Sequence, residues 1–410
     1  MSSKKKKVTI LIILVVLAAA GAGTFFALKS GVTIPFLGLS EQLSKQPGVD
    51  IGKKPVLQPP QQDKDVYVEE DDLAAYYQEQ KQKLFALTAE PIIDYWVASS
   101  TAIGDTATSS ILAASVFYIN EKGDILQVKE TGKASPIVSS SFGKPLWLKQ
   151  NVLGSQIAVK FESGKFVLFD VKNKSWREME DGVTAVDFSP DGQRIAFLKE
   201  NQSQTSVYIQ DLAKAKQPVT LIVSLTAVDF NLLWTETGSL ALTPKPSYFV
   251  NGQAWLINLS SRSLRWLGGG SGYSLVFSSP FNFGLEFSSS ARTESKIGLI
   301  DKSGKSLAEL SFSTVADKCS FSLEKKVAFC AVPYSANKSS GLVLPDDFLK
   351  RAVYFKDEIY RIDLESSAVD IVFDLEDTLF DMVDIKHRSD QLFFINRYDN
   401  QLYLYNLGSL

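Results

Sequence analysis

The chain has 410 residues, of which 45% are hydrophobic and 22% charged, and its formal net charge is −3. These values are typical of a globular protein with a sizeable core, and they exclude a disordered or strongly basic chain. Because no basic excess is present, nucleic acid is not an expected partner. The 26 phenylalanines and 14 tyrosines favour β-structure.

The N-terminus combines a basic segment with an apolar one. Four lysines at residues 4–7 precede residues 8–28, which carry no charge. A helix of that length spans roughly 30 Å, the thickness of the hydrocarbon core of a bilayer. We therefore predict a cytoplasmic N-terminus at residues 1–7 and a transmembrane helix at residues 8–28 that contacts the lipid bilayer. A cleaved signal peptide is the alternative, because residues 18–22 contain small-x-small sites. Both readings place the rest of the chain outside the cytoplasm.

Two segments of lower complexity follow. Residues 29–68 contain five prolines and predict an extended linker without a core of its own. Residues 69–90 predict a short helix, because acidic residues stand at its start and apolar side chains recur at helical spacing.

From residue 91 to residue 410 short apolar strands alternate with turn signals. The tetrapeptide Ala185 to Phe188 recurs 42 positions later as Ala227 to Phe230. A period near 40 residues is typical of the blades of a β-propeller. We therefore predict an all-β propeller, with seven blades as the preferred count and six or eight as alternatives. The expected units are residues 92–130, 144–180, 183–222, 226–268, 272–312, 316–374 and 379–408.

The last unit ends after three strands. The segment before the first hairpin, which includes residues 92–97, is the expected source of the fourth strand. Such pairing would close the ring and leave only short, protected sheet edges.

The sixth unit carries an insertion of about 20 residues between two of its strands, from Tyr334 to Val353. Long insertions in repeat proteins usually project from one face and shape a binding surface. The candidate binding residues are therefore Tyr334, Leu344, Asp346, Asp347 and Phe348.

The two cysteines flank one further hairpin. If its turn is centred between Glu324 and Lys325, Cys319 and Cys330 lie opposite each other, close enough for a disulfide. An oxidising compartment would favour the bond. The alternative is a pair of buried free thiols.

The segment Phe188 to Phe197 resembles the repeat signature of WD40-like, TolB-type propellers. In that signature an aromatic residue and Ser-Pro-Asp-Gly join two central strands of a blade. Here Ser189, Pro190, Asp191 and Gly192 supply the turn, and Ile195 and Phe197 follow on one sheet face. Weaker copies occur at residues 321–329 and 383–394. The resemblance implies a propeller fold and, as is common in that family, a protein- or ligand-binding role outside the cytoplasm; it does not carry over a catalytic site.

Residues suited to catalysis or metal binding are sparse. The single histidine, His387, is expected at a solvated hairpin turn, and it offers no triad or zinc set. Gly268 to Gly272 is expected to be a flexible connection between blades, because it lacks the end of a phosphate-binding loop. The tryptophans of the repeat region are expected to pack between blades. No cofactor or metal site is predicted.

These observations favour a membrane-anchored, extracytoplasmic propeller that binds an unidentified protein or envelope partner without catalysis. Two alternatives remain open. One is a hydrolase or lyase that acts on polysaccharide through carboxylates or tyrosines in the central channel. The other is a purely structural subunit of an envelope assembly.

Overall fold

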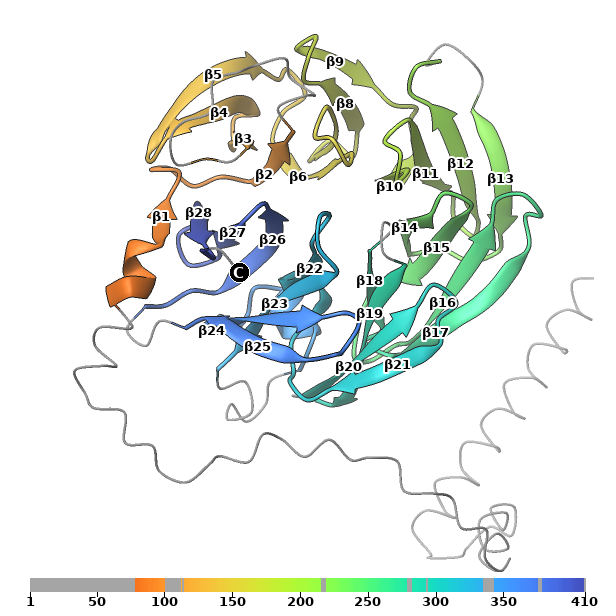
Figure 1. Cartoon of the computed structure of the whole chain (residues 1–410). Coiled ribbons are helices and arrows are strands. Elements are labelled where there is room, and N and C mark those ends of the chain that lie inside the picture. Colours follow the sequence, from red (N-terminus) through yellow and green to blue (C-terminus); the bar gives the residue numbers. More distant parts are fainter. Residues whose placement is uncertain are drawn as a thin grey trace, which may run out of the picture. The chain divides into compact units, whose positions relative to one another are not determined.

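The computed structural model describes residues 78–99, 112, 114–214, 219–278, 282–292, 294–334, 343–374 and 378–408. These residues form seven four-stranded antiparallel sheets arranged as the blades of one ring (Figure 1). The expected seven-bladed propeller is therefore confirmed. The predicted cytoplasmic segment, transmembrane helix and linker at residues 1–68 lie outside the described residues. Within the described part of the chain, no helix is both long and apolar enough to cross a bilayer.

Each of the first six blades runs outward from the ring axis in chain order. Blade 1 holds β2 (Asp94–Ala98), β3 (Ser115–Ile119), β4 (Asp124–Glu130) and β5 (Lys133–Ser139), and blade 2 holds β6 (Pro145–Gln150), β7 (Gln156–Phe161), β8 (Phe166–Asp170) and β9 (Ser175–Glu178). Blade 3 holds β10 (Val183–Phe188), β11 (Arg194–Glu200), β12 (Thr205–Asp211) and β13 (Thr220–Leu225), and blade 4 holds β14 (Phe230–Glu236), β15 (Ser239–Pro244), β16 (Asn251–Asn258) and β17 (Leu264–Ser271). Blade 5 holds β18 (Ser274–Ser278), β19 (Phe283–Ala291), β20 (Glu294–Asp301) and β21 (Ser306–Leu310), and blade 6 holds β22 (Cys319–Phe321), β23 (Val327–Pro333), β24 (Asp357–Asp363) and β25 (Val369–Phe373).

Blade 7 is closed by a strand from the other end of the described chain. Its inner three strands are β26 (Met382–Arg388), β27 (Gln391–Asn396) and β28 (Gln401–Asn406), and β1 (Leu84–Ala86) pairs with β28 as the outermost strand. Phe85 lies opposite Leu404, and the next residue but one, Leu87, donates its N–H to the carbonyl of Leu402 at 2.8 Å. The final unit therefore does end after three strands, and a preceding segment completes it.

The segment that closes the ring differs from the expected one. Residues 94–98 form β2, the innermost strand of blade 1, rather than the closing strand. Every residue of β2 is buried, which suits a strand packed between two neighbouring blades, whereas β1 is half-buried, as an outer strand is. The predicted helix at residues 69–90 lies outside the described residues up to residue 77. Its predicted end is wrong, since the helix seen at residues 78–82 stops before β1.

The repeated tetrapeptide is not a structural repeat. Phe188 is the last residue of β10, whereas Phe230 is the first residue of β14. The match at 42 residues therefore joins different positions of two blades. The predicted blade count was nevertheless right, because it follows from the number of units of alternating strands and turns and does not depend on this repeat.

Buried carboxylates link the inner strands of neighbouring blades. Asp94 in blade 1 accepts the N–H of Leu148 in blade 2 at 2.8 Å. Asp187 in blade 3 accepts the N–H of Trp234 in blade 4 at 2.7 Å. Each bond satisfies a backbone donor that the centre of the ring would otherwise leave unpaired.

Two expectations about aromatic and glycine residues need correction. Trp234 is buried as expected, but Trp266 is 57% exposed on the outer strand β17. Gly268 to Gly270 are part of the same strand and pair with β16, so they are not a flexible connection. A side chain at Gly268 would collide with the hydroxyl of the buried Tyr273, which explains the glycine there.

Candidate functional site

Two regions at opposite ends of the ring are candidate binding sites. The first, here called the channel pocket, is a cavity of about 290 Å³ at the carboxyl ends of the seven inner strands. Its walls are made by Val97, Lys149, Gln150, Asn151, Val152, Asp187, Phe188, Ser189, Pro190, Leu233, Trp234, Val276, Phe277, Ser278, Ser320, Phe321, Leu323, Lys386, His387 and Arg388. All seven blades contribute, so only the closed ring creates this cavity.

The Ser-Pro-Asp-Gly turn borders the channel pocket. Ser189 and Pro190 line the cavity, while Asp191 accepts hydrogen bonds from the Ser189 hydroxyl and from the N–H of Gln193 at 3.0 Å. These bonds hold the pKa of Asp191 below its usual value, the bond from Ser189 being the main cause. Gly192 has φ +69° and accepts the side-chain amide of Asn151 from blade 2. The turn therefore shapes the cavity rim and joins two blades.

The expectation that His387 is solvated is wrong. Its side chain is 4% exposed and stacks on Phe329, with ring centroids 5.0 Å apart. Burial lowers the pKa of His387 to about 4, so the ring is neutral at pH 7. The sequence places it next to a turn, but the neighbouring blade 6 covers it.

The tautomer of His387 follows from its partner. The Ser322 hydroxyl accepts the N–H groups of Glu324 and Lys325 at 3.0 and 2.9 Å, which leaves its own proton to donate to Nδ1 at 2.9 Å. The imidazole proton is then on Nε2. This N–H is buried and has no hydrogen-bond partner among the described residues.

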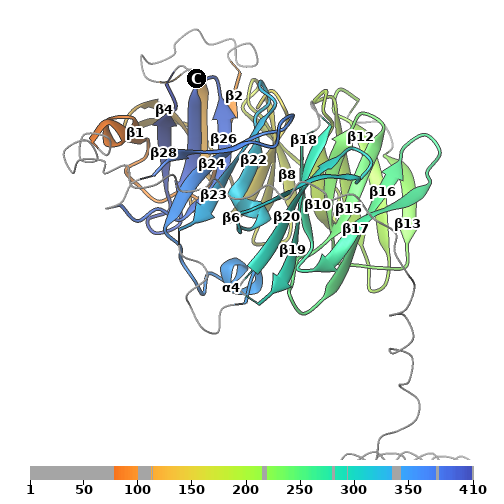
Figure 2. The same cartoon turned by 60° about the horizontal axis from the view of Figure 1, so that its bottom comes forward.

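The second region is the insertion, whose described part begins at Tyr334 and resumes at residue 343. Its short helix α4 (Asp346–Leu349) lies at one face of the ring (Figure 2). Because the insertion joins the end of β23 to the start of β24, it lies at the end of blade 6 opposite to the channel pocket. The two regions are therefore on opposite faces.

The insertion is fastened to four blades. In blade 4, Asp346 accepts the Ser247 hydroxyl at 2.8 Å and the N–H of Tyr248 at 2.7 Å. In blade 5, the Ser289 hydroxyl donates to the carbonyl of Leu344 at 2.9 Å. It also leaves from and returns to blade 6, and it contacts blade 7 through Phe348. The described residues 343–353 form a strap across the face, held by these contacts.

Most of the candidate binding residues serve this fastening. Leu344 and Phe348 are 2% and 4% exposed, and Asp347 accepts the N–H of Val343 at 2.7 Å. Among the five candidates only Tyr334, at 68%, is strongly exposed. The expectation was that all five would form the surface, but an insertion that must remain folded buries its own apolar side chains.

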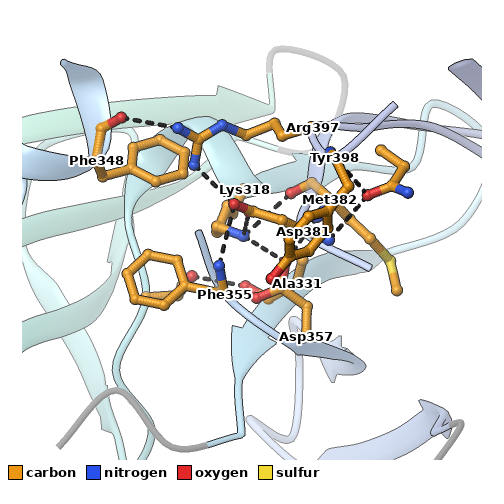
Figure 3. Close-up of polar contacts among 11 residues, drawn as sticks. Lys318, Ala331, Phe348, Phe355, Asp357, Asp381, Met382, Arg397 and Tyr398 are labelled. Atoms are coloured by element: carbon orange, nitrogen blue, oxygen red, sulfur yellow. Dashed lines mark hydrogen bonds and ion pairs between the residues drawn. The ribbon is translucent and has the colours of Figure 1, made fainter. Parts of the chain in front are cut away.

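Beneath the strap lies a buried ion cluster, shown in Figure 3. Lys318, from η1 (Ala316–Lys318), pairs with Asp357 and with Asp381, whose Oδ1 lies 2.6 Å from Nζ. Arg397 donates to Oδ2 of Asp381 at 2.9 Å and to the carbonyl of Phe348 at 3.1 Å. Two cations face two carboxylates, so the cluster is close to neutral, as burial requires.

Aromatic rings complete the cluster. Lys318 lies 5.4 Å from the ring centroid of Phe348 and 5.3 Å from that of Phe355. Burial raises the pKa of Asp357 to about 6, although Lys318 opposes the shift. Sequence reasoning missed this cluster, because its four charged residues are dispersed over blades 6 and 7 and share no spacing.

The surface around the strap is rich in exposed aromatic residues. Among the described residues five large aromatic side chains are strongly exposed, and four of them are here: Phe249, Tyr334, Tyr354 and Tyr398. Phe249 follows Tyr248, which is bonded to α4, and the rings of Tyr354 and Tyr398 are 5.3 Å apart. We call these four residues, together with the exposed Val250 and Leu349, the insertion face.

Cys319 and Cys330 are directly opposed across β22 and β23 and form a disulfide, with Cα atoms 4.1 Å apart. The bond lies in the inner half of blade 6, next to the residue that starts the ion cluster, Lys318. Among the described residues no group of three or more histidine, cysteine or acidic side chains is placed to hold a metal.

The fold defines the class of protein as a seven-bladed β-propeller. No family model and no curated protein matches the chain. Among solved structures, the hydrazine synthase of Kuenenia stuttgartiensis is similar to this chain. The match covers 66% of this chain and 78% of the synthase chain, with 12% sequence identity and a TM-score of 0.48. An oligogalacturonate lyase in complex with manganese is also similar. That match covers 72% of this chain and 83% of the lyase chain, with 10% sequence identity and a TM-score of 0.49. At such identities these likenesses concern the fold alone.

Proposed function

We propose that this protein is a membrane-anchored, extracytoplasmic propeller of the WD40-like, TolB type that binds a protein partner of the cell envelope and catalyses no reaction. The observation that carries the proposal is the insertion face. Exposed aromatic side chains gather there, whereas the rest of the described surface offers one, Trp266.

The composition of this face favours a protein partner. Tyrosine and phenylalanine are enriched in protein interfaces, because they offer a large contact area at a small loss of side-chain entropy. Phe249 follows Tyr248, which is bonded to α4, and Tyr354 packs against Tyr398, so these side chains have little freedom left to lose on association. Arg397, whose guanidinium lies 4.9 Å from the ring centroid of Tyr354, supports that ring from below.

The carbohydrate-active alternative is less well supported. A hydrolase or lyase needs several acidic or tyrosine side chains that converge on one substrate. Asp187 is the single carboxylate among the residues that line the channel pocket. Its oxygens already accept the N–H groups of Phe188 and Trp234 at 2.9 and 2.7 Å.

Site-specific photo-crosslinking in cells tests the binding proposal. A photoreactive phenylalanine replaces Phe249 or Tyr334, and the matched control replaces Trp266, which is also more than half exposed but lies on the outer strand β17. We expect the same partner to be crosslinked from positions 249 and 334 and not from 266. No crosslink at either position, or an identical product at all three, would contradict the proposal.

The membrane anchor and the compartment are part of the same proposal. They rest on the lysines at residues 4–7, the uncharged segment 8–28 and the disulfide between Cys319 and Cys330, a bond that persists in oxidising compartments. We expect protein from membranes to keep its N-terminus, and both cysteines to resist alkylation in the denatured protein until a reductant is added, since buried free thiols would react on denaturation alone. A mature N-terminus near Thr24 would indicate a cleaved signal peptide, and free thiols in cells would argue against the compartment.

A further inference from the structure

We propose that the channel pocket is a binding site for a carboxylate that carries an apolar body, held by Arg388, His387 and Ser278. The site is on the face opposite to the insertion face. It therefore does not depend on the protein-binding role proposed above, and either proposal can fail without the other.

The cavity has the size and walls of a small-ligand site. Its volume of about 290 Å³ is at the lower end of the range for ligand pockets. Apolar side chains form much of the wall: Val97, Val152, Phe188, Leu233, Val276, Phe277, Phe321 and Leu323. A ligand with an apolar body would displace water from these surfaces, which is favourable.

Positive charge exceeds negative charge along the wall. Lys149, Lys386 and Arg388 face a single lining carboxylate, Asp187. Lys149 lies 3.4 Å from Asp187, and Lys386 is paired with Asp384 and with the ring of Tyr95. The two lysines are therefore largely neutralised by acidic neighbours.

Arg388 keeps unused hydrogen-bond donors. Its Nη2 donates to the carbonyl of Val152 at 2.9 Å, while Nη1 lies 4.0 Å from Oε1 of Glu324, beyond hydrogen-bond distance. A guanidinium has five N–H donors in a planar fork that matches a carboxylate. The side chain is 15% exposed, so burial lowers its pKa and leaves it poorly hydrated, conditions in which an anionic ligand is most stabilising.

Two further polar groups in the wall lack partners. Nε2 of His387 and Oγ of Ser278 are buried, and neither has a hydrogen-bond partner among the described residues. Their side chains are 4% and 2% exposed. A buried polar group without a partner is costly, so such groups are usually satisfied by water or a ligand. Neither atom has accessible surface of its own, so each reaches a carboxylate only after a small movement of the side chains around it. Both can then donate a hydrogen bond, which a carboxylate accepts.

Calorimetry on the full-length protein in detergent tests the site. The probes are phenylacetate and its neutral amide, phenylacetamide, and a hydrophobic tripeptide ending in phenylalanine with a free or an amidated C-terminus. We expect saturable binding of the acids, and binding of the amides weaker by about tenfold or more, since hydrogen bonds to charged groups are the strong ones. A preference for phenylacetate would indicate a free acid as ligand, and a preference for the tripeptide a chain terminus.

Variants locate the binding. Arg388→Gln should weaken acid binding by about tenfold or more, whereas Lys325→Gln, which removes an equal charge from an exposed turn, should leave it unchanged. Ser278→Ala should weaken it several-fold without lowering the melting temperature, so a folding defect in the arginine variant would not hide the result. Because the chain has one histidine, its imidazole NMR signal should move on titration with phenylacetate. Acids and amides that bind alike, no saturable binding at millimolar concentration, or Arg388→Gln binding like the unchanged protein would each overturn the proposal.

Discussion

Lys318 and Asp381 form an ion pair with no exposed surface, in which Nζ lies 2.6 Å from Oδ1. The pair joins the connection before blade 6 to the connection before blade 7, directly beneath the strap. Phe348 of the strap packs on both cations of the cluster, Lys318 and Arg397. The buried ion cluster therefore supports the strap and the insertion face from beneath, although its charged groups are not accessible to a binding partner.

Removal of the central cation should destabilise the protein strongly. Lys318→Met leaves Asp357 and Asp381 buried with only Arg397 to balance them, and the loss of one partner from a buried pair costs about 3–5 kcal/mol. We expect a loss of this order in the free energy of unfolding, measured by chemical denaturation. Lys326→Met is the control, because its pair with Glu365 is exposed and is worth about 0–1 kcal/mol. Similar losses in both variants would show that the cluster contributes little.

His387 should titrate far below the usual range for histidine. Its folded-state pKa is about 4, against 6.5 for the free side chain, because burial disfavours the charged ring. Between pH 6.5 and 4 the unfolded state then binds the proton more readily than the folded state, so this residue makes stability fall as pH falls through that window. Glu324, Lys325, Arg388 and Asp390 act on the ring as nearby charges.

The single imidazole signal gives a direct measurement of this pKa. We expect its chemical shift to titrate with a midpoint near 4, and His387→Gln to remove part of the loss of stability between pH 6.5 and 4. A midpoint near 6.5 would mean that the ring is solvated.

The closing strand β1 and the residue that follows it, Leu87, should contribute to the free energy of unfolding as much as a core strand does. Leu87, which follows β1, is 1% exposed and packs in the core cluster shared by blades 7 and 1. Leu87→Ala should lower the free energy of unfolding by about 2–5 kcal/mol, the usual cost of a cavity in a core. Leu146→Ala, at a position 44% exposed, should change it by less than about 0.5 kcal/mol. A small effect at Leu87 would indicate that the ring closes without this segment.

Two glycines allow a matched test of the close packing in β17. Gly268→Ala would drive a methyl group into the Tyr273 hydroxyl, which bonds Glu286 at 3.2 Å, and should lower the melting temperature by several degrees, since overpacking costs about 1–3 kcal/mol. Gly238→Ala meets no atom within 4 Å and should be neutral or slightly stabilising. Equal effects would show that the segment around Gly268 can shift to make room.

Local pattern was sufficient where the structure depends on neighbours in sequence. The alternation of apolar residues and turn signals predicted seven units, and the spacing of Cys319 and Cys330 placed them opposite each other, because a hairpin is a local object. The Ser-Pro-Asp-Gly turn could be placed for the same reason, down to the positive φ of Gly192. The three strands of the last unit were likewise visible as three apolar runs.

Contacts between segments that are far apart in the sequence could not be predicted from local pattern. The closing strand pairs Phe85 with Leu404 across more than 300 residues, and nothing in either segment marks the other. His387 looks solvated from its sequence neighbours, but blade 6 covers it. Blade number was thus determined by the chain itself, through the alternation of apolar strands with turn signals. The channel pocket, the ion cluster and the exposure of the insertion were decided only when the ring closed, because burial depends on which blade packs against which.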